Sequence, residues 1–166
     1  REHAIAWKLS QNSKVEKIYT AAGNAGIDLL EKGECINLKT VDEILEFAAE
    51  KFGTKLVVVL GHSHCGAVTA CVETLINPDQ QFSPNLRSIV DRIRPSVYNL
   101  HEIYTANGQD MDVQELIERG TKANVRMSVS QLKHGSRILE DAVSAGNLLI
   151  VGAVYDLDTG EVRFLD

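Results

Sequence analysis

The sequence has few cysteines and no long apolar run, and each shortage excludes a class of protein. Three cysteines among 166 residues are too few for the disulfide framework of a small secreted domain. Free thiols, a metal site or a catalytic thiol in a reducing compartment are therefore expected. No apolar run is long enough to span a bilayer, and residues 1–11 lack the apolar core of a signal peptide. These features predict a cytoplasmic protein with no membrane partner.

Basic charge is also scarce. Lysine and arginine number 17 against 23 acidic residues, which gives a net charge of −6. Proteins that bind nucleic acid usually carry a basic face, so no nucleic-acid partner is expected. The chain does have the composition of a globular protein, with 44% hydrophobic and 24% charged residues. Its length suits one α/β domain over residues 1–166.

Short strand-like segments alternate with helical ones along the chain. We expect strands at Val15–Tyr19, Cys35–Leu38, Leu56–Leu60, Leu148–Val154 and Glu161–Leu165. The third of these is apolar without alternation, which favours a central parallel strand buried on both faces. The last follows a short turn and should be an antiparallel edge strand. The pattern predicts a three-layer α/β fold with one mostly parallel sheet.

Two helices carry clear boundary signals. Thr40 and Glu43 have the spacing of a capping box, and Gly53 is placed to end the helix that they begin. A second helix is expected over Leu86–Ile93, and Pro95 should stop it because proline cannot donate a helical hydrogen bond.

The residues with the clearest chemical potential follow the strand Leu56–Leu60. His62 and Cys65 are two residues apart on a tight turn between glycines, just past the carboxyl end of that strand. Imidazole and thiolate are ligands that zinc prefers, and the positive end of the following helix favours a thiolate. The same turn could be a plain connection or hold a cysteine nucleophile. His64 is a further candidate ligand whose spacing points it elsewhere on the turn.

Several segments resemble one known family. Residues 55–70, KLVVVLGHSHCGAVTA, are similar to the His-x-x-Cys segment of β-class carbonic anhydrases. The resemblance continues, in the family's order, through residues 83–86, 89–95, 124–125, 131–132 and 149–160. It covers about residues 41–166 and implies a β-carbonic anhydrase-like fold.

The resemblance also implies an activity and a metal. Members of the family are zinc enzymes that interconvert carbon dioxide and bicarbonate, and they hold the metal with two cysteines and one histidine. His62 and Cys65 match the second and third ligands. The family builds its active site at a dimer interface, so a homodimer is expected.

The first ligand of the family has no match. It lies in a Cys-x-Asp-x-Arg segment that also supplies an Asp–Arg pair, and no cysteine precedes Cys35, which lies in ECINL. If Cys35–Leu38 is a parallel strand, Cys35 lies at its amino end, on the order of 10 Å from the level of His62 and Cys65. The sequence thus predicts a weak or incomplete zinc site and impaired carbon dioxide hydration. The alternative is a non-catalytic hybrid or engineered α/β scaffold with a vestigial zinc site.

The opening of the chain resembles a different family. Residues 1–11, REHAIAWKLSQ, and residues 15–19, VEKIY, look like the amino-terminal domain of phosphoribosylamine–glycine ligase, as do residues 22–26 and 35–37. The ATP-grasp region of that family is absent, so ligase activity is not expected. The chain is therefore interpreted as a chimera, with residues 1–40 ligase-like and the junction near residues 40–54.

Overall fold

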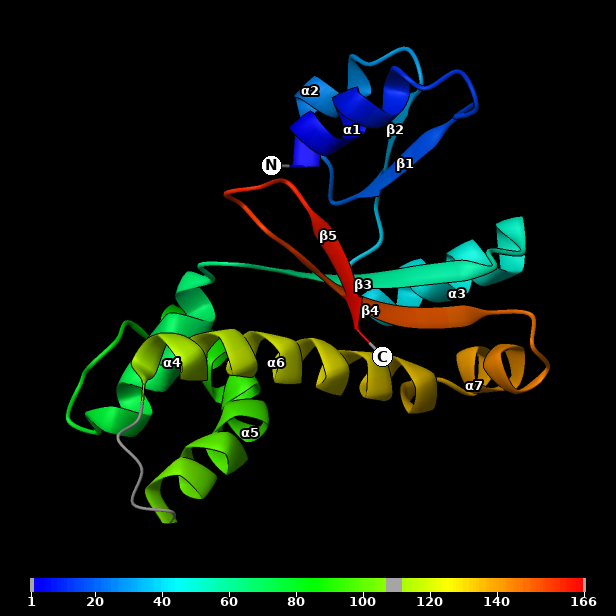
Figure 1. Cartoon of the computed structure of the whole chain (residues 1–166). Coiled ribbons are helices and arrows are strands. Elements are labelled where there is room, and N and C mark those ends of the chain that lie inside the picture. The colour runs from blue at the N-terminus through cyan, green and yellow to red at the C-terminus, as the bar shows by residue number, and fades with distance from the viewer. Residues whose placement is uncertain (1, 107–111, 166) are drawn as a thin grey trace. The chain divides into compact units, whose positions relative to one another are not determined.

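The computed structural model describes residues 2–106 and 112–165, and its contacts divide the chain into two compact units. The amino-terminal unit is Arg1–Thr54 and the carboxyl-terminal unit is Lys55–Asp166. Each unit has its own sheet (Figure 1). The boundary falls at the end of the stretch where the sequence places the junction of the chimera. That residues 1–166 form a single domain stays a prediction.

The amino-terminal unit holds two strands and three helices. Its elements are α1 (Glu2–Ser10), β1 (Ile18–Ala21), α2 (Ala25–Asp28), β2 (Gly33–Ile36) and α3 (Val41–Phe52). β1 and β2 pair in parallel, with Ile18 opposite Gly33. Ile27 of α2 is fully buried, and Ala6 of α1 is nearly so.

The helix α3 begins and ends where its local signals predict. The Thr40 hydroxyl accepts a hydrogen bond from the Glu43 amide at 3.2 Å, and the Glu43 carboxylate accepts one from the Thr40 amide at 3.2 Å. Gly53 ends the helix with a left-handed φ of 58°. The predicted capping box and C-terminal glycine are both confirmed.

The carboxyl-terminal unit holds the larger sheet. Its elements are β3 (Leu56–His62), α4 (Gly66–Ile76), α5 (Pro84–Ala106), α6 (Val113–Gly135), α7 (Arg137–Ser144), β4 (Leu149–Tyr155) and β5 (Val162–Leu165). The strand order is β3-β4-β5, with β3 and β4 parallel and β5 antiparallel. The α/β class and the antiparallel edge strand are confirmed.

The strands of the chain lie in two units, and that all of them share one sheet stays a prediction. The strand expected at Val15–Tyr19 forms at Ile18–Ala21, where it pairs with β2. Within the carboxyl-terminal unit β3 pairs with β4, and that Leu56–Leu60 is a central strand stays a prediction. Strand pairing depends on contacts between distant residues, which local patterns do not encode.

The two faces of β3 differ in burial, which corrects the expectation of a strand buried on both faces. Leu56, Val58 and Leu60 are 51%, 40% and 50% exposed. The opposite face packs against α6, which runs along the sheet (Figure 1). A side-chain carbon added at Gly61 would lie 2.6 Å from Val125 of α6, so this helix approaches the strand closely.

The helices α4, α5 and α6 enclose the main apolar core. Its fully buried side chains include Val68, Val72, Val97 and Leu116. The prediction that Pro95 ends a helix is wrong, because α5 continues through it to Ala106. Buried side chains on both sides of the proline pack into this core and hold the helix together. None of the described helices is long and apolar enough to cross a membrane.

Candidate metal site

His62 and Cys65 lie at the two ends of the turn that joins β3 to α4. His62 is the last residue of β3, and Cys65 is the N-cap residue of α4. Both side chains are half-buried. Cys65 packs against the apolar core of the helices. The turn therefore brings an imidazole and a thiol to the carboxyl edge of the sheet, as the sequence predicts. That the two side chains converge on one metal ion stays a prediction.

A hydrogen bond fixes the tautomer of His62. Its Nδ1 lies 2.8 Å from the carbonyl oxygen of Ser63. A carbonyl oxygen can only accept, so Nδ1 carries the proton and donates it. In the neutral ring Nε2 then has its lone pair free, which is the form that binds a metal.

Hydrogen bonds hold the turn against the β4–β5 hairpin, and of the residues that make them the sequence identified His64 alone as a candidate. The Ser63 amide donates to the carbonyl oxygen of Tyr155 at 2.9 Å, and the Ser63 hydroxyl accepts from the Leu157 amide at 2.8 Å. His64 has a left-handed φ of 53°, and its Nε2 lies 2.8 Å from Asp158 Oδ2. The sequence shows residues 156–160 as a turn, but nothing local pairs that turn with the one at residues 62–65.

Contacts at this hairpin shift the pKa values of His64 and Asp156. The hydrogen bond from His64 to the Asp158 carboxylate, and the negative charge there, raise the pKa of His64 above its ordinary value. Backbone amides of Thr159 and Asp158 donate to Asp156 and lower the pKa of its carboxyl group. His64 is thus engaged with the hairpin, which agrees with its expected direction away from His62 and Cys65.

Cys35 does not lie where the sequence places it. The strand begins at Gly33 instead of Cys35, so Cys35 is near its carboxyl end, and that strand belongs to the smaller sheet. The premise that Cys35 lies at the amino end of its strand is therefore wrong. The Cys35 thiol contacts the carbonyl oxygen of Asn24 at 3.6 Å, and its pKa is raised by burial and by Asp28. Cys71 is fully buried in the helical core, as expected of a small apolar residue.

The donor set of the turn is incomplete for a catalytic zinc ion. Such a site needs three protein ligands. Within residues 2–106 and 112–165, no group of three or more histidine, cysteine, aspartate or glutamate side chains is placed to hold a metal. That His62 and Cys65 are two ligands of a zinc ion stays a prediction, and so does the absence of a third ligand.

Comparison with known proteins identifies the family of the segment that contains this turn. The family model described as carbonic anhydrase matches residues 22–162, most of the chain. The chain belongs to the carbonic anhydrase family. Carbonic anhydrase 2 of Mycobacterium tuberculosis is 30% identical over 122 residues, which are 74% of this chain and 54% of that protein. The chain thus spans about half the length of this curated carbonic anhydrase.

Solved carbonic anhydrases share the fold. A tetrameric β-carbonic anhydrase from Sordaria macrospora superposes with a TM-score of 0.64 at 18% identity, over 95% of this chain and 84% of that one. The Coccomyxa β-carbonic anhydrase gives a TM-score of 0.57 at 20% identity, over 99% and 78% of the two chains. At these identities the likeness concerns the fold alone.

The amino-terminal segment matches a different enzyme. Phosphoribosylamine–glycine ligase of Fusobacterium nucleatum is 61% identical over 51 residues, which are 31% of this chain and 12% of that protein. Both predicted resemblances are therefore confirmed. The carbonic anhydrase match begins at residue 22, so it starts earlier than the body expected from residue 41.

Proposed function

We propose that this chain is a zinc-dependent carbonic anhydrase, acting on carbon dioxide and bicarbonate, whose activity is impaired by an incomplete metal site. The observation that carries the proposal is the family match across residues 22–162. It includes the His62–Cys65 turn, which has the ligand types and the tautomer that zinc requires. Bound zinc would supply a hydroxide near neutral pH as the nucleophile.

The proposed impairment rests on the missing third ligand. Zinc held by two protein side chains lacks one of the bonds that fix a catalytic site, so it should bind weakly. His62 and Cys65 are the proposed metal residues.

A non-catalytic scaffold is the second candidate. The ligase-like opening favours it, since the amino-terminal segment matches an unrelated enzyme at 61% identity. In that case the turn of His62 and Cys65 would be vestigial, and the chain would bind zinc only weakly or not at all.

Metal content of the purified chain tests the proposed metal residues and the missing third ligand. We expect substoichiometric zinc in the wild-type protein, none in Cys65→Ser, and an unchanged amount in Cys35→Ser, measured by plasma mass spectrometry. Cys71→Ala is the matched control, because it removes a buried thiol outside the turn. Stoichiometric zinc that is lost in Cys35→Ser would restore a complete site and contradict the proposed impairment.

Stopped-flow hydration of carbon dioxide then tests turnover. Weak activity that follows zinc content across the same variants would support an impaired carbonic anhydrase. Activity absent at saturating zinc, or unchanged in Cys65→Ser, would favour the scaffold.

We also propose that the chain forms a homodimer in the cytoplasm. The exposed apolar side chains Leu56, Val58 and Leu60 on β3 support association with another copy. The three cysteines are free thiols, which agrees with a reducing compartment. Light scattering coupled to gel filtration would test the dimer, and a monomer at micromolar concentration would contradict it.

A further inference from the structure

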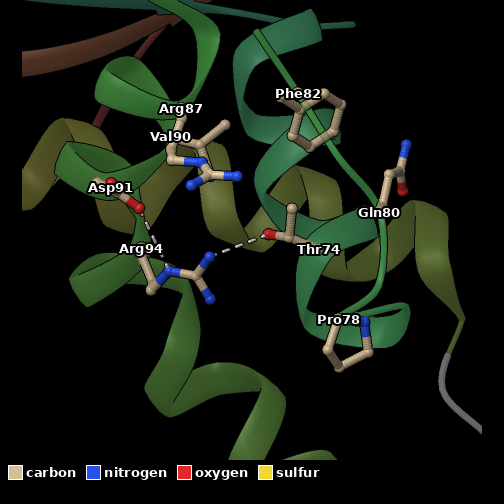
Figure 2. A pocket seen from close by; sticks show the side chains of 8 residues that line it. All are labelled: Thr74, Pro78, Gln80, Phe82, Arg87, Val90, Asp91 and Arg94. Atoms are coloured by element: carbon tan, nitrogen blue, oxygen red, sulfur yellow. Dashed lines mark hydrogen bonds and ion pairs between the residues drawn. The ribbon is translucent and has the colours of Figure 1, made fainter. Parts of the chain in front are cut away.

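A pocket lies between α5 and the end of α4, on a part of the carboxyl-terminal unit that the metal turn does not use. Its volume is about 310 Å³, at the lower end of the range for small-molecule sites. Figure 2 shows the eight side chains that line it. They are Thr74, Pro78, Gln80, Phe82, Arg87, Val90, Asp91 and Arg94.

Two arginines on the same face of α5, about two turns apart, supply positive charge to this pocket. Arg87 and Arg94 both project from α5 toward α4 and the loop that follows it (Figure 2). Within the described part of the chain, no hydrogen bond or ion pair engages the Arg87 guanidinium. An unengaged guanidinium offers a planar set of donors that suits an oxyanion.

Arg94 is held in place by protein contacts. Its Nη2 donates to the Thr74 hydroxyl at 3.4 Å, and its Nε lies 3.9 Å from Asp91 Oδ1. The Thr74 hydroxyl donates its own proton to the carbonyl oxygen of Cys71 at 2.7 Å, so its lone pairs face Arg94. Asp91 offsets part of the charge, which leaves the lining with two cations and one anion.

Phe82 and Val90 give part of the remaining wall an apolar character. Val90 is buried, and Phe82 packs against the apolar core of the helices. Gln80 is turned toward the rim, where its amide donates to the Glu73 carboxylate at 3.3 Å. The pocket therefore combines a cationic side with an apolar side, and it has more room than a bare oxyanion fills.

We propose that this pocket binds a small phosphate monoester, with the phosphate between Arg87 and Arg94 and the organic part against Phe82. A phosphate is favoured over a carboxylate because two guanidinium groups attract a doubly charged anion more strongly than a singly charged one. The proposal does not depend on metal binding at His62 and Cys65.

The test is a titration of the full chain with phenyl phosphate, followed by ¹H–¹⁵N correlation spectra. We expect a dissociation constant on the order of 1 mM. The largest shifts should fall on Thr74, Gln80 and Phe82. Inorganic phosphate should bind more weakly because it lacks the apolar part, and benzoate more weakly because it carries a single charge.

Variants on one helix provide the matched control. Arg87→Gln should weaken phenyl phosphate binding by about tenfold or more, since it removes a charge-assisted contact. Arg92→Gln makes the same charge change on α5 outside this pocket and should alter the affinity by less than about twofold. Arg94→Gln should also weaken binding. Because Arg87 is exposed, its variant should fold, which an unchanged spectrum outside the pocket would verify.

Four results would overturn the proposal. The first is that the wild type does not bind phenyl phosphate at a ligand concentration roughly ten times the expected dissociation constant. The second is that Arg87→Gln binds phenyl phosphate as tightly as the wild type, and the third is that the wild type binds benzoate as tightly as phenyl phosphate. The fourth is that the spectral shifts centre on residues 62–65.

Discussion

At the scale of single residues, the sheet and α6 meet where glycines leave room for them. A side-chain carbon built on Gly152 would lie 2.7 Å from Val125, closer than real carbon atoms approach. The same valine faces Gly61 at 2.6 Å. Glycine at these two positions therefore lets α6 lie close to β3 and β4, behind the strand that carries His62.

The close approach predicts that even a methyl group added at Gly152 lowers the stability of the fold. Gly152→Ala should lower the free energy of unfolding by about 1–3 kcal/mol, because the core has no space for the methyl group. Adding Val125→Ala to this variant should cost less than the two single changes together, since it removes the clash. Denaturant unfolding measures all of these values.

Gly135 is the control for this prediction. It has nothing within 4 Å of an added side-chain carbon, so Gly135→Ala should be neutral or stabilising by up to about 1 kcal/mol. Equal losses at Gly152 and Gly135 would mean that crowding against Val125 is not the cause.

At the scale of elements, α3 depends on the ionised form of Glu43. Its carboxylate accepts from the amides of Lys39 at 2.8 Å and Thr40 at 3.2 Å, which lowers the pKa of the carboxyl group below its ordinary value of 4.5. A lowered folded-state pKa contributes stability above the unfolded pKa, and that contribution is lost as the pH falls through the folded pKa.

This linkage predicts a pH-dependent effect of Glu43→Ala. The variant should have a lower midpoint of thermal unfolding than the wild type at pH 7, and the difference should shrink as the pH falls below the ordinary carboxyl pKa. Circular dichroism at 222 nm follows the loss of α3. Glu50→Ala, on the same helix without a capping contact, should show a smaller effect, and a pH-independent difference for Glu43→Ala would contradict the linkage.

The elements show which features a sequence can predict. The bounds of α3 came out correctly, because a capping box and a terminal glycine act within one helical turn. The predicted end of a helix at Pro95 was wrong, because packing of α5 against α4 and α6 outweighs the missing backbone hydrogen bond. Leu56–Leu60 was expected to be buried on both faces, yet an apolar run does not reveal what covers each face.

At the scale of the whole chain, local patterns identified both families but not the pairing of strands. The segment around His62 and Cys65 carries its resemblance in consecutive residues, so the family could be found. Cys35 was misplaced because its strand starts at Gly33 and pairs only with β1 among the described strands. Sheet membership depends on contacts between distant residues, which local patterns do not encode.

The two units also differ in how much apolar surface they bury. Ala6 and Ile27 are the buried apolar residues of the described amino-terminal unit, whereas the carboxyl-terminal unit has a continuous core around α4, α5 and α6. In the smaller unit, Tyr19, Phe47 and Phe52 cluster with ring centroids 4.9–6.4 Å apart, yet Phe52 is 47% exposed. Stability should therefore be uneven along the chain, because few buried contacts permit local opening.

Hydrogen exchange measured by mass spectrometry checks this last prediction. Amides of β1, β2 and α3 should exchange at least about tenfold faster than those of α4, α6 and β4, since a tenfold difference corresponds to about 1.4 kcal/mol of opening free energy. The comparison should be made after correction for intrinsic rates. Equal protection of the two units would mean that they open together as one cooperative structure. In that case the buried core of the carboxyl-terminal unit would stabilise the ligase-like opening as well.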